Sequence, residues 1–486
     1  MSFLGRVAHF GALRADSFVL TLLLPFSPYS AQHPVSWGGH RRFCTGSAME
    51  TQGRGKIGAN NNRIPQATSM RSQSVLQQEV RAAVDNLNWP PLASRRWEPL
   101  AAIPLDEGGV VGVEGTKRLK VLSWNVLCDG LSGAHPTQGG FLKAPKDSLE
   151  WDKRRWKILE EILRWDCDVL VLQEVDHHHD WLSPMLAKEG YRSLFVKKPV
   201  APGLAFNPHL EDGCSLFYRA TAPVTTTTAM SADEAVETTM MTPPMTLDLL
   251  DAHMFTLAVV EEGSPEEREG AGDNDKNGRQ KEPAEPVAGN QVAMISLLGV
   301  SSSGGVDGGD VGGETLVIVS TTHLKAVKNA HGEMMRGRQA KQLLDEVARF
   351  RAGHESARGL PSGSIPLIVA GDFNATPRSS GGYEPLCHRQ VTTHALALRS
   401  ALPTGEDFFT TWKIRPANKP PVKGSEVEEG ATRESKHCID YMWVSGGVQP
   451  TSGSTLPSAE ELGPTRAPSF VYPSDHFAIA VDLRLP

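Results

Sequence analysis

The 486-residue chain is poor in cysteine, and its six cysteines show no Cys-x-x-Cys spacing. This pattern excludes a disulfide framework and a cysteine-ligated zinc site, and it is typical of a protein from a reducing compartment. The chain also lacks an uninterrupted apolar run of about 18 residues, the length that a membrane-spanning helix needs. We therefore expect no membrane span.

An excess of positive charge is also missing, because 49 Lys and Arg stand against 56 Asp and Glu, a formal net charge of −7. This balance argues against a protein whose whole surface coats nucleic acid, so any polyanion must be met by a local basic cluster. Internal repeats are absent, including a leucine-rich array ahead of the core. Hydrophobic residues make up 40% of the chain, which is enough for a substantial core.

The first fifty residues are expected to be a targeting peptide rather than part of the fold. Residues 1–49 contain four arginines and a single acidic residue, the composition of an organelle transit peptide. This favours a mitochondrial location, with plastid or cytoplasm as alternatives, and the apolar run Phe18–Phe26 leaves a secretory signal open. Residues 51–117 are expected to form a disordered linker with one short helix at Val75–Leu87.

From Leu119 onward, apolar segments alternate with amphipathic ones, which predicts a mixed α/β domain over residues 118–486. Helices are expected at Asp152–Trp165 and around Leu343, Leu344 and Val347. Strands are expected at Leu119–Val126, Val169–Leu172, Leu316–Val319, Leu367–Val369, Ile439–Val444 and Phe477–Leu485. Disordered insertions are predicted near 261–290 and 301–313, which lack periodicity and are rich in charge or in Ser, Gly and Asp.

Polar residues interrupt these strands at their ends. Asn125 follows one strand, Glu174 the next, His323 a third, and Asp372 and Asn374 a fourth. Strand ends in α/β proteins are where ligands bind, because side chains from several strands can meet there. A single residue of this kind is most simply a turn former, but five at successive strand ends indicate one shared cavity.

The identity of these residues narrows the chemistry. Asn125, Glu174, Asp372 and Asn374 offer hard oxygen donors, which suit Mg²⁺ or Mn²⁺ better than zinc. A histidine beside them could transfer a proton or stabilise charge at a phosphoryl group. The candidates for this role are His323 and His476, with Asp440 and Asp475 to orient and polarise them. The set therefore predicts metal-assisted hydrolysis of a phosphoric ester.

The same motifs, taken in order, resemble the motif series of the endonuclease/exonuclease/phosphatase superfamily. They are Asn125, Gln173-Glu174, Thr322-His323-Leu324, Gly371-Asp372-Phe373-Asn374, Asp440-Tyr441 and Ser474-Asp475-His476. Any one motif is weak, whereas the ordered set over about 350 residues is highly specific. The resemblance implies a four-layer α/β sandwich in which helices flank two mixed β-sheets.

Within the superfamily, further segments resemble the nocturnin family. They are Lys198-Pro199, Asp212-Gly213-Cys214, Thr410–Arg415 and Gly463–Phe470. This resemblance implies a Mg²⁺-dependent phosphatase that removes the 2′-phosphate of NADP⁺ and NADPH. The alternative, with the same metal site, is a poly(A)-specific 3′-exoribonuclease acting on RNA, and a binding protein with an inactive site is a third hypothesis.

The resemblance also implies roles for individual residues. Glu174 would be the main Mg²⁺ ligand, with Asn125 close to the metal and the phosphate. Asp372 and Asn374 would position the attacking water and the scissile group. The residues expected to contact the phosphate or to support those contacts are His323, His476, Asp440 and Asp475. The residues expected to bind the substrate are Lys198, Asp212, Lys325, Lys413 and Arg415.

One position departs from the nocturnin pattern. Where that family has an arginine two residues beyond the lysine of the His-Leu-Lys segment, this chain has Val327. Lys328 is adjacent and could substitute, although as a point charge rather than a bidentate fork. The run His177–His179 predicts no metal site, because adjacent residues do not share one face. We expect a monomer that acts on a compact dinucleotide and has no membrane partner.

Overall fold

The computed structural model describes residues 73–102, 117–133, 140–201, 204, 211–221, 245–259, 287–301, 315–378, 382–405, 407–417 and 432–486. All of these belong to one compact unit, Met70–Pro486. The expected targeting peptide and most of the two expected insertions lie outside the described residues. Within the described ranges, no helix is both long and apolar enough to cross a membrane.

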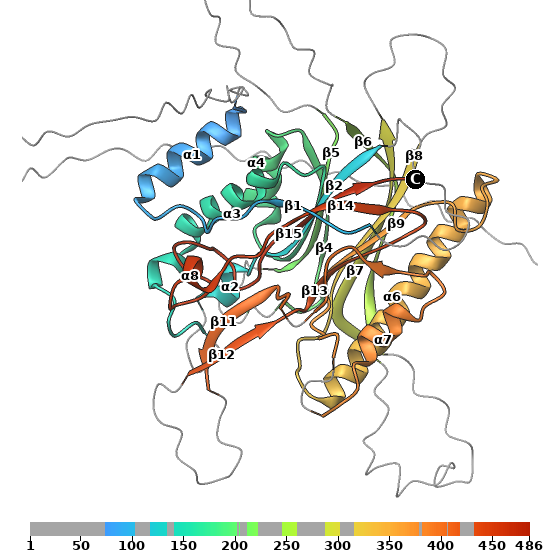
Figure 1. Ribbon diagram of the computed structural model, residues 1–486. Helices are drawn as coiled ribbons and strands as arrows, with labels where there is room; N and C mark the ends of the chain where they lie inside the picture. The colour runs from blue at the N-terminus through green and yellow to red at the C-terminus, as the bar shows by residue number, and fades with distance from the viewer. Residues whose placement is uncertain are drawn as a thin grey trace, which may run out of the picture. The chain divides into compact units, whose positions relative to one another are not determined.

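Two β-sheets stack face to face in the centre of this unit (Figure 1). The strands of the first are β1 (Trp97–Pro99), β2 (Arg118–Asn125), β3 (Val169–Val175), β4 (Tyr191–Lys197), β5 (Gly213–Arg219), β14 (Gln449–Ser454) and β15 (Ile479–Arg484). Their spatial order is β1-β14-β15-β2-β3-β5-β4. The β2–β3 pair is parallel, and the other pairs of this sheet are antiparallel.

The strands of the second sheet are β6 (Thr246–Val259), β7 (Val287–Ser301), β8 (Thr315–His323), β9 (Leu367–Asp372), β10 (Arg399–Ser400) and β13 (Asp440–Ser445). They lie in the order β10-β13-β9-β8-β7-β6, and β8–β9 is the parallel pair. A separate antiparallel hairpin consists of β11 (Thr411–Pro416) and β12 (Thr432–His437).

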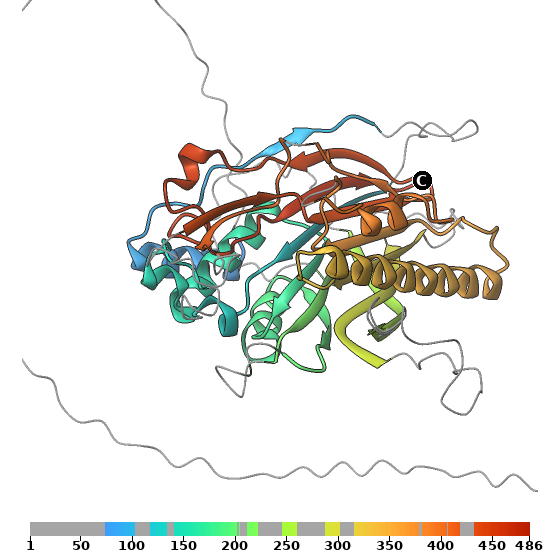
Figure 2. The same ribbon diagram turned by 90° about the horizontal axis from the view of Figure 1, so that it is seen from below.

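Helices cover the outer faces of the two sheets (Figures 1 and 2). The first sheet is covered by α1 (Val75–Leu87), α3 (Trp151–Trp165) and α4 (Ser183–Ala187), and the second by α6 (Ala330–Ala357) and α7 (Leu386–Thr392). The short elements are α2 (Asp129–Ser132), α8 (Ala459–Leu462), a 3₁₀ turn (Lys146–Leu149) and a π turn (His178–Leu182). The predicted four-layer α/β sandwich is confirmed.

Alternation along the central strands explains the layers. In β3, Val169 and Val171 face the second sheet, whereas Leu170 and Leu172 face the helices. Since successive side chains of a strand point to opposite faces, a fully apolar run supplies two cores at once. This is why the short apolar runs of the sequence are correctly predicted as buried strands.

The segment before the predicted domain boundary differs from the linker prediction, which is wrong for residues 88–102 because they are ordered and include strand β1. The predicted helix Val75–Leu87 is confirmed and begins with a capping box between Ser74 and Gln77. Beyond it, β1 pairs with β14, and Arg95 forms a buried 2.6 Å ion pair with Glu161 of α3. Beyond the helix, the apolar residues of this segment follow neither a helical nor an alternating period, and an ion pair between residues 66 positions apart leaves no signal in the sequence.

A long hairpin of β6 and β7 was not predicted. Its second strand begins at Val287, so Val287 and Ala288 of the expected insertion pair with Val259 and Ala258 of β6 instead. Main-chain hydrogen bonds to a partner strand stabilise such residues without requiring an apolar pattern. Residues 260–286 and 302–314 lie outside the described residues, and their predicted disorder stays a prediction.

Candidate active site

Most of the predicted site residues lie at one edge of the two stacked sheets. Asn125 ends β2, His323 ends β8 and Asp372 ends β9, all three on strands of the parallel pairs. Asp440 begins β13 directly opposite Asp372, because β13 runs antiparallel to β9. His476 comes shortly before β15, which runs antiparallel to β2. The sequence prediction that these strand ends converge therefore agrees with the structure.

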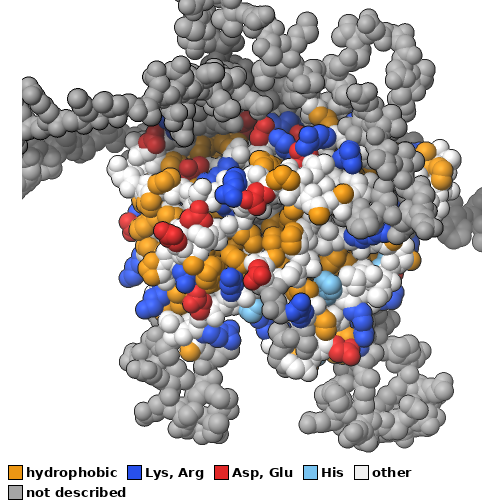
Figure 3. All heavy atoms as spheres, viewed as in Figure 1, with side chains coloured by type: hydrophobic (Ala, Val, Ile, Leu, Met, Phe, Trp, Pro, Cys, Tyr) orange, Lys and Arg blue, Asp and Glu red, His pale blue; other side chains and the backbone are white. Residues whose placement is uncertain are grey.

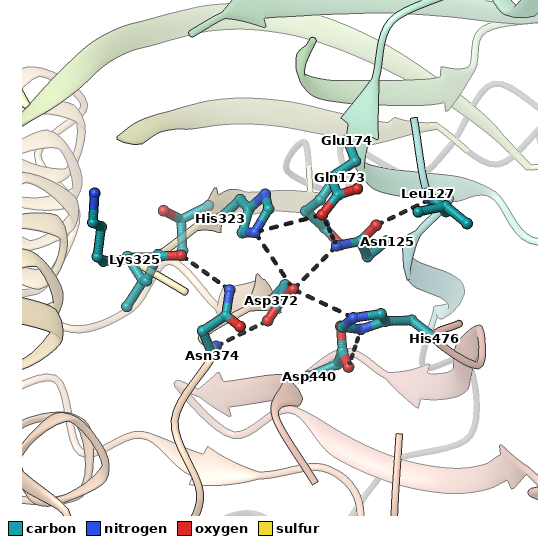
Figure 4. Close-up of polar contacts among 12 residues, drawn as sticks. Asn125, Leu127, Gln173, Glu174, His323, Lys325, Asp372, Asn374, Asp440 and His476 are labelled. Atoms are coloured by element: carbon teal, nitrogen blue, oxygen red, sulfur yellow. Dashed lines mark hydrogen bonds and ion pairs between the residues drawn. The ribbon is translucent and has the colours of Figure 1, made fainter. Parts of the chain in front are cut away.

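The side chains point toward one another across the gap between the sheets (Figure 4). Asn125 Nδ2 donates hydrogen bonds to Glu174 Oε1 at 2.9 Å and to Asp372 Oδ2 at 3.1 Å. Asn125 Oδ1 accepts a hydrogen bond from the Leu127 amide. Asn125 thus presents N–H rather than oxygen to the centre, so its arrangement favours a bridging role over direct metal ligation.

Glu174 is aimed at the centre by an irregularity in β3. Its φ is +54°, which is uncommon for a residue other than glycine, and the register against β5 shifts between Leu172 and Val175. Such a bulge re-aims one side chain and stores local strain. Burial alone would raise the pKa of Glu174, but His323 and Lys198 outweigh it and leave the pKa below its ordinary value.

Asp372 is almost fully buried and has a strongly altered acidity. Burial, followed by repulsion from Asp440, raises the pKa of Asp372 to about 7. Its other oxygen, Oδ1, accepts the Asn374 amide at 2.9 Å, and Asn374 Nδ2 donates to the Leu324 carbonyl oxygen at 3.0 Å. These bonds fix the loop that carries both predicted residues.

Asp440 and His476 form a buried pair. His476 Nδ1 lies 2.9 Å from Asp440 Oδ2, which also accepts a 2.5 Å hydrogen bond from Thr410 Oγ1. Burial would lower the pKa of His476, but Asp440 and Asp372 together raise it to about 9. The imidazole is therefore protonated at neutral pH, and its Nε2 faces Asp372 Oδ2 at 3.9 Å.

His323 has the opposite character. Its Nε2 lies 3.5 Å from Asp372 Oδ2 and 4.0 Å from Glu174 Oε1. Burial, then the charge of Lys198, lowers the pKa of His323 to about 3, so the ring is neutral. Its Nδ1 is buried and has no hydrogen-bond partner among the described residues. The site thus holds one charged and one neutral histidine.

Two of the four predicted substrate-binding cations, Lys413 and Arg415, lie on strand β11 and share one carboxylate. Lys413 Nζ lies 2.5 Å from Asp475 Oδ2, and an Arg415 guanidinium nitrogen lies 3.4 Å from the same oxygen. Lys413 and His476, against the effect of burial, lower the pKa of Asp475 well below its ordinary value. Asp475 therefore holds Lys413 and Arg415 next to the Asp440–His476 pair.

Lys198 and Asp212 pair with each other rather than pointing to solvent. Lys198 Nζ lies 2.5 Å from Asp212 Oδ2, and both side chains are buried. Lys198 is also close enough to influence the acidity of Glu174. Lys325 is half-buried and its ammonium points away from the carboxylates in Figure 4. Direct substrate contact by Lys198, Asp212 and Lys325 stays a prediction.

The donor set suits a hard divalent cation. Glu174 and Asp372 converge on one amide, and Asp440 adds a third carboxylate nearby. Atoms of Asp372, Asp440 and His476 lie within 4.8 Å of one another, but Asp440 and His476 already satisfy each other. Glu174 is therefore the residue that would hold the cation, with oxygen ligands of the kind Mg²⁺ prefers, and Asp372 faces the same centre from the other side of the Asn125 amide.

Two contributors were missed by the sequence analysis. Thr410 orients Asp440, and Cys128 lies against the carboxylate of Glu174 with Sγ 3.7 Å from Oε2. Neither follows a strong strand pattern. Thr410 lies in the segment Thr410–Arg415, which resembles the nocturnin family, but that resemblance assigned it no role.

A sequence profile of the Endonuclease/Exonuclease/phosphatase family matches residues 122–476. A nocturnin of Xenopus laevis is 28% identical over 374 residues, which span 75% of this chain and 72% of that protein. The human nocturnin is 29% identical over 367 residues, 75% of this chain and 64% of its own length. A solved structure of the human nocturnin catalytic domain with bound sulfate matches 81% of this chain and 97% of that domain, with 22% identity and a TM-score of 0.48.

Proposed function

Because this chain belongs to the endonuclease/exonuclease/phosphatase family of phosphoric ester hydrolases, we propose that it removes the 2′-phosphate of NADP⁺ and NADPH with the help of Mg²⁺. The observation that carries the proposal is the buried meeting of Glu174, Asp372 and Asn125 beside one protonated and one neutral histidine. The products would be NAD⁺ or NADH and inorganic phosphate.

Hydrolysis requires neutralised phosphoryl oxygens, an oriented water and a proton for the leaving 2′-oxygen. A bound divalent cation supplies part of that neutralisation. Asp372, with its pKa near neutrality, is placed to accept the proton of the attacking water, and Asn374 fixes its orientation. His476 carries the complementary proton at Nε2 and can donate it to a phosphoryl oxygen or the leaving group.

The size of the basic cluster supports a compact substrate. Lys413 and Arg415 gather on one short hairpin beside His476. On the face shown in Figure 3, Lys and Arg alternate with Asp and Glu around a band of hydrophobic side chains, without a continuous basic track. A compact polyanion suits such a cluster better than a long RNA, which favours a basic groove with stacking aromatics. The similarity to nocturnins supports the same substrate.

The deciding experiment compares two substrates. Purified protein is incubated with NADPH or with an oligoadenylate, with Mg²⁺ or with a chelator, and phosphate and 5′-AMP are measured. We expect Mg²⁺-dependent phosphate release from NADPH and little 5′-AMP. Release of 5′-AMP from the oligoadenylate, without phosphate release from NADPH, would support the exoribonuclease alternative. Absence of product from both substrates would support the third hypothesis, a binding protein with an inactive site.

A matched pair of variants tests the metal assignment. Glu174→Gln removes the charge but keeps the shape, and we expect hydrolysis to fall by about 10³-fold or more, as when one catalytic electrostatic contact is lost. Glu460→Gln, at an exposed position of α8, should change it by less than twofold. Unchanged turnover in Glu174→Gln would show that Glu174 does not hold the catalytic cation.

We also propose a mitochondrial location for the protein, supported only by the arginine-rich and acid-poor residues 1–49. A fluorescent reporter fused after residue 50 tests it directly. Accumulation in mitochondria is expected, and accumulation in plastids, in the secretory route or in the cytosol would replace the proposal.

A further inference from the structure

Arg95 lies in the segment between α1 and β1, ahead of the predicted catalytic domain, yet its side chain is completely buried. Each nitrogen of its guanidinium group donates at least one hydrogen bond. Two of the acceptors, the Tyr472 hydroxyl and the Ala478 carbonyl oxygen, lie on either side of His476 in the sequence. Arg95 therefore connects the predicted linker to the candidate active site.

Tyr472 and Ala478 form the base of the His476 loop, residues 472–478. The Ala478 amide donates a 2.9 Å hydrogen bond to the Tyr472 hydroxyl oxygen, which closes the loop. The same oxygen accepts a hydrogen bond from Arg95 Nη1 at 2.9 Å, and its own proton is donated to Glu161 Oε1 at 3.0 Å. The Tyr472 hydroxyl thus uses its donor and both of its acceptor positions, so the base of the loop has one defined arrangement.

Arg95 also ties this base to the first sheet. Its Nη2 donates to the Ala478 carbonyl oxygen and, at 3.3 Å, to Ser454 Oγ at the end of β14, while Nε donates to the Thr455 carbonyl oxygen at 2.7 Å. A planar guanidinium offers five N–H donors in one fixed fork, and an ammonium group cannot reach all of these acceptors at once. The base of the loop is therefore fixed relative to β14 through Arg95.

The charge of Glu161 does not explain this arrangement by itself. Arg164, on the same helix α3, also pairs with Glu161, at 3.1 Å. Glu161 therefore has a second cationic partner, and the contribution specific to Arg95 is its hydrogen bonds to Tyr472 and Ala478.

The position of the His476 loop matters because His476 has to reach a residue of the other sheet. Its Nδ1 lies 2.9 Å from Asp440 Oδ2 at the beginning of β13, whereas the base of the loop is held at β14 and α3. A shift of the base therefore changes the distance between His476 and Asp440. A misplacement of about 1 Å in an active site can cost about 10²-fold in rate.

We propose that Arg95 is a positioning residue for hydrolysis, because it fixes the His476 loop where His476 meets Asp440. The inference rests on the proposed function and deepens it, since it makes the segment between α1 and β1 part of the active enzyme and not only of the fold.

The test replaces Arg95 by lysine, which keeps a positive charge near Glu161 but loses the fork. In Arg95→Lys, we expect kcat for NADPH to fall by about 10²-fold and KM to stay within about threefold, because the predicted substrate-binding cations of β11 are unchanged. The alkaline limb of the kcat/KM profile should also move to lower pH, because Asp440 stabilises the protonated His476 less when the two are farther apart.

Arg96→Lys is the matched control. Arg96 is the next residue in the chain, its side chain is 77% exposed, and it pairs with the exposed Glu98. This variant should leave kcat and KM within about twofold and the alkaline limb in place, because an exposed ion pair contributes little.

Ser74→Ala is the control for a loss of stability alone. It removes the capping box of α1, and the hydrogen bonds of Ser74 go to Gln77 and Glu189 rather than to the His476 loop. Its Tm should fall while its kcat stays the same. An equal loss of kcat in Ser74→Ala, or an unchanged kcat in Arg95→Lys, would overturn the positioning role.

Tyr472→Phe gives a second test that keeps the ring and removes the hydroxyl group that Arg95 holds. We expect kcat to fall in this variant as well. Combined with Arg95→Lys, it should lose less than the product of the two single effects, because both changes act through the same hydrogen bonds. Fully multiplicative effects would show that Arg95 does not act through the His476 loop.

Hydrogen–deuterium exchange without substrate separates this role from the proposed function. The backbone amides of the His476 loop should exchange about tenfold faster or more in Arg95→Lys than in the unaltered protein, while those of β3 and β9 keep their rates. If NADPH is not hydrolysed but this local increase is found, the proposed substrate fails and the placing of the loop by Arg95 stands. Unchanged exchange in the loop, or an equal increase throughout the chain, would overturn that role whatever the substrate.

Discussion

The side-chain amide of Gln173 donates a 3.1 Å hydrogen bond to Thr321 Oγ1 across the space between the two sheets. Both side chains are fully buried. Gln173 precedes Glu174 in β3, and Thr321 comes two residues before His323 in β8. One hydrogen bond therefore sets the separation of a predicted cation ligand and a predicted phosphate contact that lie in different sheets.

Thr321→Val should reduce both stability and activity. The substitution leaves the buried Gln173 amide without its acceptor in the other sheet, which costs about 1–3 kcal/mol in the free energy of unfolding. Loss of the fixed spacing should also lower kcat. Thr315→Val, at the opposite end of the same strand, serves as the control in urea unfolding and in turnover. Equal effects of the two variants would show that the bond does not align the sheets.

Asp440→Asn should shift the pH dependence of hydrolysis. Asp440, followed by Asp372, raises the pKa of His476 to about 9 against the effect of burial, so His476 stays protonated through neutral pH. With a neutral amide beside it, the imidazolium loses its main stabilising partner, and the alkaline limb of the kcat/KM profile should move to lower pH. We expect a loss of about 10²-fold or more at pH 8.

Asp152→Asn, on the exposed side of α3, should leave the profile unchanged. If the alkaline limb of Asp440→Asn stayed in place while the rate fell, Asp440 would be acting on something other than the protonation of His476.

Gly371→Ala should damage the site more than the fold. Gly371 has φ +153°, and a Cβ there would overlap the Thr322 carbonyl oxygen of the neighbouring strand. The adjacent Asp372 would be displaced, and a misplacement of about 1 Å can cost 10²-fold in rate. Gly353→Ala, in α6 with open space around it, should keep full activity and gain up to about 1 kcal/mol of stability. Wild-type turnover by Gly371→Ala would contradict the close packing of β8 and β9.

His178 should make the fold sensitive to acid. Its ring is buried, stacks on Phe195 and lies 2.9 Å from Ser215 Oγ; burial, then His179, lowers its pKa to about 4. Between pH 6.5 and pH 4 the unfolded chain therefore binds a proton that the folded chain does not. Stability is then fully present above pH 6.5 and falls with decreasing pH, by roughly 3 kcal/mol at most.

Thermal unfolding of His178→Phe, which keeps a ring but removes the titration, should depend less on pH between 7 and 5 than that of the unaltered protein. His331→Gln, at an exposed position of α6, provides the comparison because His331 does not act on His178. A pH dependence that is identical in all three proteins would place the acid sensitivity elsewhere.

The central strands and the catalytic edge were predictable from sequence because two patterns coincide there. Runs such as Val169–Leu172 are apolar on both faces, and each is followed at once by a polar residue that has no role in a core. That combination places a side chain at the end of a buried strand, and the sheet topology then brings the ends together. The identity of the donors was enough to indicate phosphoric ester hydrolysis.

Other parts depend on contacts between residues far apart in the chain. The Lys198–Asp212 pair is buried only because β4 and β5 fold together, so neither residue differs from a surface charge in the sequence. The orientation of the Asn125 amide depends on Leu127 and two carboxylates, and no sequence pattern reports it.

The pairing of β1 with β14 has a consequence for expression of this protein as a fragment. A polypeptide that starts at residue 118, where the apolar pattern begins, would lack Arg95, one of the two guanidinium partners of the buried Glu161, and would leave Glu161 with Arg164 alone. It would also leave the outer backbone amides and carbonyls of β14 open to other molecules, and such unprotected strands promote self-association. Soluble, monodisperse material is therefore expected only from fragments that begin at or before Ser74.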